Sequence, residues 1–265
     1  MNARKIGLGI AIFWAMVCVL SLFFIKEPLD LNLSDEFVSP SLEYWLGTTV
    51  NGVDVWKFLV AGAKRSLGLS LFSAVVCAIL AMLVGALGYL FGRKVDRLVF
   101  SVISFFQALP GFLIFVMVSV FSGTSALGVI FSLVLAYWAG FARMMRALIQ
   151  QFSEREFVLA HQSLGATLFQ TFRVCILPNV LGPFVVYFCH RLKIFILSES
   201  AMSFLGFGYE PGTPSWGALI AQGRDSTLFA PHVLIVGSLA LLSLLFAVEA
   251  VATSCENLLK SQKPG

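Results

Sequence analysis

Six long apolar segments constrain this chain more than any other feature of its sequence. Each has about the 20 apolar residues that a helix needs to cross the hydrocarbon core of a bilayer. Of the 265 residues, 58% are hydrophobic and only 12% are charged, a balance that water-soluble domains do not reach. We therefore expect an all-α membrane protein with six transmembrane helices in a single domain, residues 1–265. The segments are residues 6–25, 67–91, 99–121, 129–148, 180–205 and 232–254.

The first segment could instead be a signal peptide, because Arg4 and Lys5 precede its apolar run. The run is longer than the apolar region of a signal peptide, and residues 22–26 make a poor cleavage site. We expect a helix that is retained.

The Lys and Arg residues of the loops predict which side of the membrane each loop occupies. They gather at the N-terminus, after the second segment, after the fourth segment and at the C-terminus, so that all four places fall on one side. Cytoplasmic loops carry an excess of Lys and Arg, so we expect both termini and the loop 149–178 in the cytoplasm. The loop 26–64, which is richer in Asp and Glu, and the segment 206–231 are then expected outside.

No catalytic residue or metal-binding cluster is expected from the sequence. It lacks the G-x-x-x-x-G-K-[ST] phosphate loop, so we expect this chain not to hold ATP in such a loop, and it lacks both H-E-x-x-H and G-x-S-x-G. His161, His190 and His232 lie in different segments, and no Cys/His spacing suits a metal. The net charge of +4 reflects the cytoplasmic loops rather than a nucleic-acid partner. An intramembrane enzyme is therefore a distant alternative.

Residues 156–183 form a polar, amphipathic stretch between two apolar segments. Helical spacing places five of its residues on one face, Gly165 interrupts the run, and Pro178 is expected to end the next helix. A short amphipathic helix on the cytoplasmic side is typical of a contact with a partner protein. A helix lying on the membrane surface is the alternative. The expected face consists of Phe157, His161, Leu164, Leu168 and Phe172.

This stretch resembles the cytoplasmic coupling loop of ABC-transporter permeases. That loop has a Glu-Ala-Ala core, then a glycine, and ends in Ile-x-Leu-Pro. Ala160, Gly165 and residues 176–178 stand at the matching positions. Leu159 replaces the glutamate of the core, and Glu156 lies about one helical turn earlier.

Further motifs extend the resemblance to the dipeptide/oligopeptide/nickel branch of these permeases, and within it to the C-type subunit of a heterodimeric pair. Each string is weak alone, but their order along the chain is specific. They are residues 44–48 (YWLGT), 108–110 (ALP), 142–146 (ARMMR), 203–208 (SFLGFG), 214–217 (PSWG), 223–225 (GRD) and 230–231 (AP).

The resemblance implies an ABC importer permease with the MetI-like fold in a bacterial inner membrane. Its partners would be the lipid bilayer, a homologous second permease, two ATPase subunits that carry ATP and Mg, and an extracytoplasmic substrate-binding protein. This chain would bind no cofactor itself. The segment 206–231 would border the mouth where the binding protein docks, or serve only as a connector. The implied ATPase-coupling residues are Glu156, Ala160, His161, Leu164, Gly165 and Leu168.

Peptides are the leading substrate, because peptide permeases share most of these motifs. Nickel import is the alternative within the same branch. A channel or structural membrane subunit that does not couple to ATP is a more distant alternative, against which the coupling-loop resemblance argues.

Four residues are expected on the substrate path. Arg191 and Lys193 lie near mid-membrane, where charges are the default functional residues, and helical geometry points them about 200° apart. One is expected on the path and the other against a neighbouring helix; snorkelling or an ion pair, with Glu199 as one partner, is the alternative. Gln107 and Pro110 mark a break in the third span, either a hinge or pore-lining kink or a static one. A cationic path suits a peptide carboxylate better than nickel.

Overall fold

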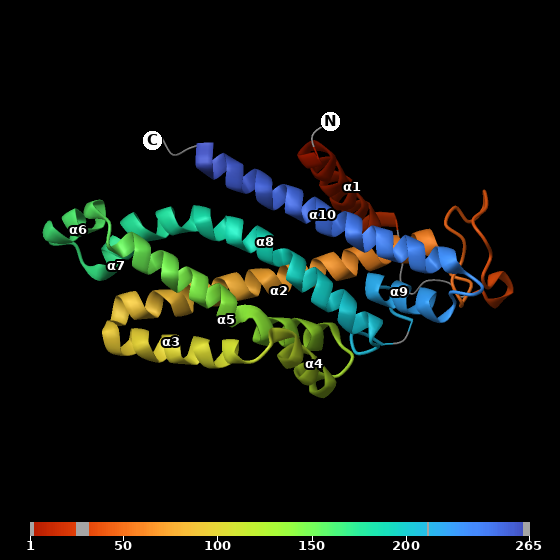
Figure 1. Ribbon diagram of the computed structural model, residues 1–265, viewed down its shortest axis with the longest axis horizontal. Coiled ribbons are helices and arrows are strands. Elements are labelled where there is room, and N and C mark those ends of the chain that lie inside the picture. The colour runs from red at the N-terminus through yellow and green to blue at the C-terminus, as the bar shows by residue number, and fades with distance from the viewer. Residues whose placement is uncertain (1–2, 25–31, 211, 262–265) are drawn as a thin grey trace.

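The computed structural model describes residues 3–24, 32–210 and 212–261, and this part is almost entirely helical, as the sequence predicts (Figure 1). The long helices run side by side, with residues 33–54 at one end and α6 and α7 at the other (Figure 1). We name these the outer end and the inner end, after the orientation that the sequence predicts. The helices are α1 (Ala3–Phe24), a 3₁₀ turn (Leu33–Asp35), α2 (Val55–Phe91), α3 (Arg93–Ala108), α4 (Gly111–Ser122), α5 (Ala126–Ser153), α6 (Glu156–Ser163), α7 (Leu168–Thr171), a π-helical turn (Phe172–Ile176), α8 (Leu177–Phe204), α9 (Trp216–Asp225) and α10 (Pro231–Ser261).

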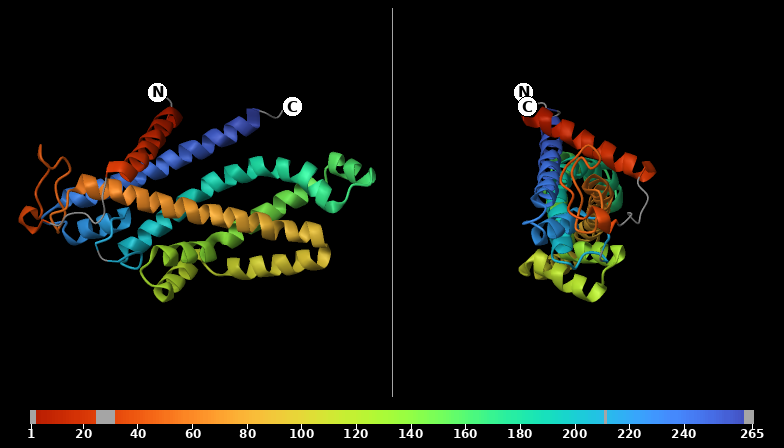
Figure 2. Two further views of the ribbon diagram at one scale, coloured as in Figure 1. Left: turned by 180° about the vertical axis from the view of Figure 1, so that it is seen from behind. Right: turned by 90° about the vertical axis from the view of Figure 1, so that its right-hand side faces the viewer.

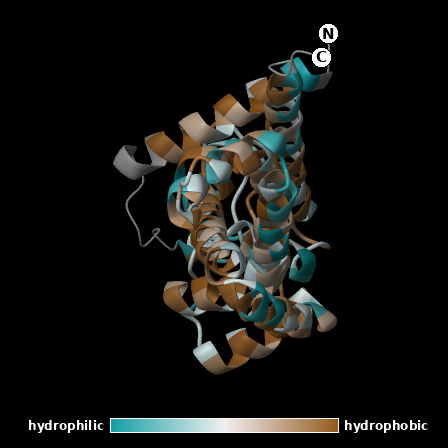
Figure 3. Ribbon diagram, turned by 90° about the vertical axis from the view of Figure 1, so that its left-hand side faces the viewer, coloured by the Kyte–Doolittle hydropathy of each residue, from teal (hydrophilic) through white to brown (hydrophobic). Residues whose placement is uncertain are grey.

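Four described helices are long and apolar enough to cross a membrane, and the bent pair α3–α4 makes a fifth if it counts as one span. The four are α2, α5, the run from Leu168 through α8, and α10. Apolar residues cover the helices over much of their length (Figure 3). The first predicted span is helical as α1, but the side chains of residues 20–24 lie outside the described residues. The count is therefore four or five rather than the predicted six, and the sixth span stays a prediction.

The third predicted span, residues 99–121, is not one straight helix. It consists of α3 and α4, which meet at an angle of 82°. Leu109 is extended, with φ −93° and ψ 138°, as expected for a residue before proline, and Pro110 caps α4. The predicted break at Pro110 is therefore confirmed, and it is a sharp bend between two helices rather than a shallow kink.

The outer loop is shorter than predicted, because α2 already begins at Val55. The Asp54 carboxylate accepts a hydrogen bond from the Trp56 amide at 2.8 Å, which satisfies a free donor of the first turn. Residues 55–64 of the predicted outer loop 26–64 are therefore helical, residues 26–31 lie outside the described residues, and the placement of the loop outside the membrane stays a prediction. The segment 206–231 likewise contains a short helix, α9.

Small residues let α2 and α5 pack closely along most of their length. A Cβ atom on Gly85 would lie 2.8 Å from Met145 Cγ, and Cys77 Sγ lies 3.7 Å from the Val134 carbonyl oxygen. Lipid offers no hydrophobic driving force between helices, so close backbone approach carries the association. The buried small residues of this seam on α2 are Ser70, Ala74, Cys77, Ala81, Gly85 and Gly88.

A second cluster ties the outer end together around Trp216 of α9, which is fully buried. Its Nε1 donates to the Leu59 carbonyl of α2 at 2.9 Å, and its ring lies 4.7 Å from that of Trp14. Trp14 in turn donates to Ser243 of α10 at 2.9 Å. The two indole rings thereby join α1, α2, α9 and α10. Figure 2 shows α1 lying across α10.

At the inner end, a bidentate ion pair joins α3 to α5. Arg146 Nε lies 2.6 Å from Asp96 Oδ1, and Arg146 Nη2 lies 2.7 Å from Asp96 Oδ2. Both side chains are about one-fifth exposed, at 18% and 21%. Gly88 of α2 makes room, because a Cβ there would clash with the Asp96 carboxylate.

The ion pair should contribute to the stability of the inner end. Asp96→Asn or Arg146→Gln leaves the other charge without its partner, and we expect each to cost about 2–3 kcal/mol. The double variant should cost no more than either single one, since the cost comes from the orphaned charge. Thermal unfolding of the purified protein measures this. Arg97→Gln, at an exposed neighbouring position, is the control. Additive losses in the double variant would contradict the coupling.

Candidate functional site

Helices α6 and α7 project from the inner end of the bundle, opposite the outer loop (Figure 1). Gly165 lies between them with φ +89°, a left-handed conformation that glycine adopts without steric cost. Thr167 then begins α7 through a capping box with Gln170. The predicted interruption at Gly165 is therefore confirmed as the turn between two short helices.

The structure brings the six predicted coupling residues together in this projection. Five are exposed: Glu156 and Ala160 on α6, Leu164 and Gly165 at the turn, and Leu168 on α7. Leu164 is the most exposed large residue here, at 87%. A group of exposed apolar side chains on one projection is typical of a contact with another protein. Here the group consists of Phe157, Leu159, Leu164, Leu168 and Phe169.

His161, the sixth, faces inward instead. Its Nδ1 lies 3.1 Å from Thr171 Oγ1, so that it holds α6 against the start of the long helix. Gln162 Nε2 donates to Tyr89 of α2 at 3.0 Å, and Val158 is fully buried. These contacts hold α6 against the bundle, and the Gln162–Tyr89 hydrogen bond connects it directly to α2.

The predicted single apolar face is wrong. Gly165 separates its first three members from Leu168, and Phe172 is buried with its ring 6.1 Å from that of Tyr89. One helical period does not continue through a left-handed residue, which explains the error. Sequence reasoning also missed Leu159 and Phe169, which are 50% and 62% exposed, although apolar residues in a polar loop were a usable signal.

Pro178 does not end a helix, contrary to the prediction. The helix continues from Leu168 to Phe204, and Pro178 lies in the first turn of α8 directly after the π-helical turn. In that turn the Leu177 amide donates to the Phe172 carbonyl, one residue further back than in an α-helix. The missing N–H of Pro178 is tolerated at this position.

Two predicted path residues meet beside Gly140 of α5. A methyl group on Gly140 would lie 3.2 Å from Arg191 Nη2, 3.5 Å from Tyr187 Oη and 3.8 Å from Gln107 Nε2. Tyr187 donates to the Gly140 carbonyl at 3.1 Å, and Arg191 Cζ lies 5.7 Å from the centre of the Tyr187 ring. Arg191 Nε is buried and has no hydrogen-bond partner among the described residues. Gln107 and Pro110 are both exposed, and Pro110 lies at the bend that comes after Gln107.

Lys193 points to the other side of α8, as the predicted spacing requires. It forms an ion pair with Glu249 of α10, and His190 lies 3.6 Å from Glu249 and 3.7 Å from Glu256. Glu249 is therefore the ion-pair partner of Lys193.

Glu199, named as one partner for the alternative ion pair, pairs with neither Arg191 nor Lys193 among the described residues. It is fully buried, and the Ser200 and Ser203 hydroxyls each donate to its carboxylate at 3.3 Å. Six residues beyond Lys193 on the same helix, it lies on a different side.

Comparison with known proteins places residues 74–253 in the family described as "Binding-protein-dependent transport system inner membrane component". A putative peptide transport system permease protein of Brucella suis biovar 1 is 30% identical over 256 residues, which cover 96% of this chain and 86% of that protein. The dipeptide transport system permease protein DppC of Bacillus subtilis is 28% identical, over 84% of this chain and 70% of its own length. The glutathione transport system permease protein GsiD of Pectobacterium atrosepticum is 29% identical, over 76% and 67%.

The fold is that of a solved importer. A chain of the inward-facing MetNI methionine ABC transporter superposes with a TM-score of 0.65 at 19% identity, covering 78% of this chain and 97% of that chain. The predicted MetI-like fold is confirmed. In importers of this kind the ATPase is a separate subunit, as the missing phosphate loop predicts. The chain therefore belongs to the binding-protein-dependent inner membrane component family and is a permease subunit of an ABC importer.

Proposed function

We propose that this permease imports di- and oligopeptides, and that the α6–α7 projection is its contact with an ATPase subunit. The observation that carries the coupling assignment is the exposed apolar tip around Leu164, braced from behind by Gln162 and His161. A motor subunit moves membrane helices only through a rigid contact, and a short helix lodged in a groove provides one.

The full importer contains further chains. A homologous second permease completes the translocation path, and two ATPase subunits carry ATP and Mg at the inner end. An extracytoplasmic binding protein delivers the substrate. This chain then binds no cofactor, and ATP-driven closure of the ATPase pair reorients the path by alternating access. An uncoupled channel would have no use for the braced apolar tip.

Peptide rather than nickel is the substrate class that the residues favour. Arg191 meets Gln107 and Tyr187 beside Gly140, and among the described residues no carboxylate pairs with it. Arg191 is partly buried. Its guanidinium repels a metal cation and attracts a carboxylate, which every unmodified peptide carries. The three relatives described above are named for peptide, dipeptide and glutathione transport, which points the same way. We assign Arg191 and Gln107 to the path, and Lys193 to an ion pair that holds α8 against α10.

Leu164→Asp tests the coupling contact. Burying a leucine is worth about 1.5–3 kcal/mol, so we expect at least about a tenfold loss of ATP hydrolysis stimulated by loaded binding protein. ATPase subunits should also be lost on purification, while membrane insertion stays normal. Gly165→Pro should have a similar effect, because proline fixes φ near −65° and this site has φ +89°.

Leu228→Asp is the matched control for the coupling test. Leu228 is 92% exposed, and it comes after α9 at the opposite end of the molecule. It should keep its ATPase subunits. Normal coupling in Leu164→Asp, or an equal loss of ATPase subunits from Leu228→Asp on purification, would overturn the assignment.

Arg191→Gln tests the path. Uptake of dipeptides per assembled complex should fall, with a loss of about 2 kcal/mol or less in affinity because the path is hydrated. Lys193→Gln should instead lower the yield of assembled complex, since Glu249 loses its partner. The measurement is uptake of neutral, anionic and cationic dipeptides, normalised to complex. Unchanged uptake and preference in Arg191→Gln would remove it from the path.

Cysteine labelling tests the proposed orientation, with both termini in the cytoplasm. Leu42 in the outer loop is 98% exposed, and Ser163 at the end of α6 is also exposed. In a variant without native cysteines, Leu42→Cys should react with an impermeant reagent in intact cells. Ser163→Cys should react only after the membrane is opened. The reverse pattern would invert the topology.

A further inference from the structure

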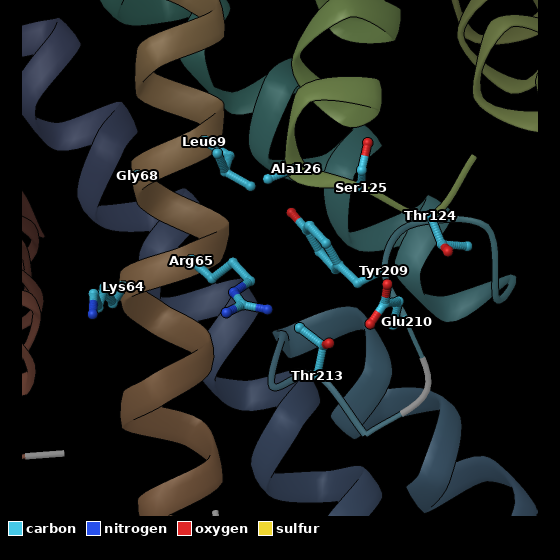
Figure 4. Close-up of a pocket in the computed structure, with 10 residues that line it drawn as sticks. All are labelled: Lys64, Arg65, Gly68, Leu69, Thr124, Ser125, Ala126, Tyr209, Glu210 and Thr213. Carbon is cyan, nitrogen blue, oxygen red and sulfur yellow. The ribbon is translucent and has the colours of Figure 1, made fainter. Parts of the chain in front are cut away.

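A cavity of about 420 Å³ opens at the outer end of the bundle, away from both sites described above (Figure 4). Its walls come from the start of α2, the turn between α4 and α5, and the segment after α8. The volume falls in the range of small-molecule sites. Unlike the apolar groove between α1, α2, α8 and α10, its lining is rich in charged and hydroxyl groups. The polar residues among them are Lys64, Arg65, Thr124, Ser125, Tyr209, Glu210 and Thr213.

Arg65 supplies the positive charge of this cavity. Its side chain points from α2 toward Tyr209 and Thr213 (Figure 4). The guanidinium carbon lies 5.6 Å from the centre of the Tyr209 ring, a cation–π distance that fixes its direction. Burial, and after it the neighbouring Glu199 carboxylate, raise the pKa of Tyr209. The phenol therefore stays neutral at physiological pH.

The opposite wall supplies a negative charge. Glu210 is exposed and comes directly after Tyr209, so that a carboxylate and a guanidinium border the same space from different elements (Figure 4). Thr213 and Thr124 add hydroxyls that donate or accept hydrogen bonds. The cavity therefore presents groups that suit a ligand with one charge of each sign.

Lys64 is next to Arg65 in sequence but turns away from it. Its side chain points to the other side of α2 (Figure 4), where it also borders the apolar groove beside Trp14 and Leu67. The chain therefore offers a cation of the same helical turn that does not share the direction of Arg65. Lys57, an exposed cation earlier on the same helix, does not border the cavity and is the matched control for a role of charge at this end of the protein.

We propose that this outer cavity binds a small zwitterion, with Arg65 taking its carboxylate and Glu210 its ammonium group. The proposal rests on the proposed function, since an unmodified peptide is such a zwitterion. The site would hold the substrate at the outer mouth, before it reaches Arg191. A cavity with one charge of each sign on facing walls discriminates against ligands that lack either terminus, because one wall then loses its charge-assisted hydrogen bond to the ligand.

The test is direct binding to the purified permease–ATPase complex without the binding protein. A radiolabelled dipeptide with free termini should bind saturably, and Arg65→Gln should weaken it about tenfold, as expected for a lost charge-assisted hydrogen bond. Lys57→Gln should bind like the wild type, because Lys57 does not border the cavity. A C-terminally amidated dipeptide should compete poorly with the wild type, and this handicap should vanish in Arg65→Gln. An N-acetylated dipeptide should likewise compete poorly with the wild type, and this handicap should vanish in Glu210→Gln.

Two further measurements separate the possible outcomes. The complex should retain the binding protein equally well in the wild type and in Arg65→Gln. A loss only in the variant would mean that Arg65 pairs with an acidic side chain of the binding protein, and it would overturn the proposal. If the complex imports peptides but amidated and free dipeptides compete equally, the outer site is wrong while the proposed function stands. If the wild type neither imports nor binds peptides, both fail.

Discussion

Close packing of α2 against α5 is the constraint on which the rest of the structure depends. Within a bilayer no hydrophobic effect drives helices together, so they associate where small residues let the backbones approach. The seam from Ser70 to Gly88 provides this approach, and its last glycine also makes room for Asp96. With α2 and α5 fixed, α3 is clamped by the Asp96–Arg146 pair and α8 packs on both.

The same helix joins the two ends of the molecule. Arg65 borders the outer cavity and Tyr89 receives the hydrogen bond of Gln162 from α6. At 1.5 Å per residue, the 24 residues between them span about 36 Å. If α2 moves as a unit, a displacement of the α6–α7 projection would be carried to the outer cavity by this one helix. The proposed outer site therefore borders one part of α2, and the proposed contact with the ATPase is held against another part of the same helix.

Sequence reasoning succeeded where one residue or one period decides the structure. Hydropathy located the long helices, Pro110 located the bend, and Gly165 located the turn between α6 and α7. It failed where distant residues decide. Lys57, Lys64 and Arg65 broke the hydropathy signal, so the first three turns of α2 were taken as loop. The π-helical turn has no recognisable signal in the sequence. The Asp96–Arg146 ion pair and the Tyr187–Gly140 hydrogen bond join separate helices, whose proximity no local pattern encodes.

The contrast between Arg191 and Lys193 shows how the fold separates structure from transport. Both charges sit on one stretch of α8, and both are costly at membrane depth unless they are compensated. Lys193 is compensated within the chain by Glu249, which makes it a permanent contact between α8 and α10. Among the described residues, Arg191 has the Tyr187 ring beside it and no carboxylate, and its Nε stays unpaired. On the proposed path, a substrate that brings a carboxylate relieves this cost only while it occupies the site. A charge that is paired only while the substrate is bound favours passage of the substrate over its retention, as an importer requires.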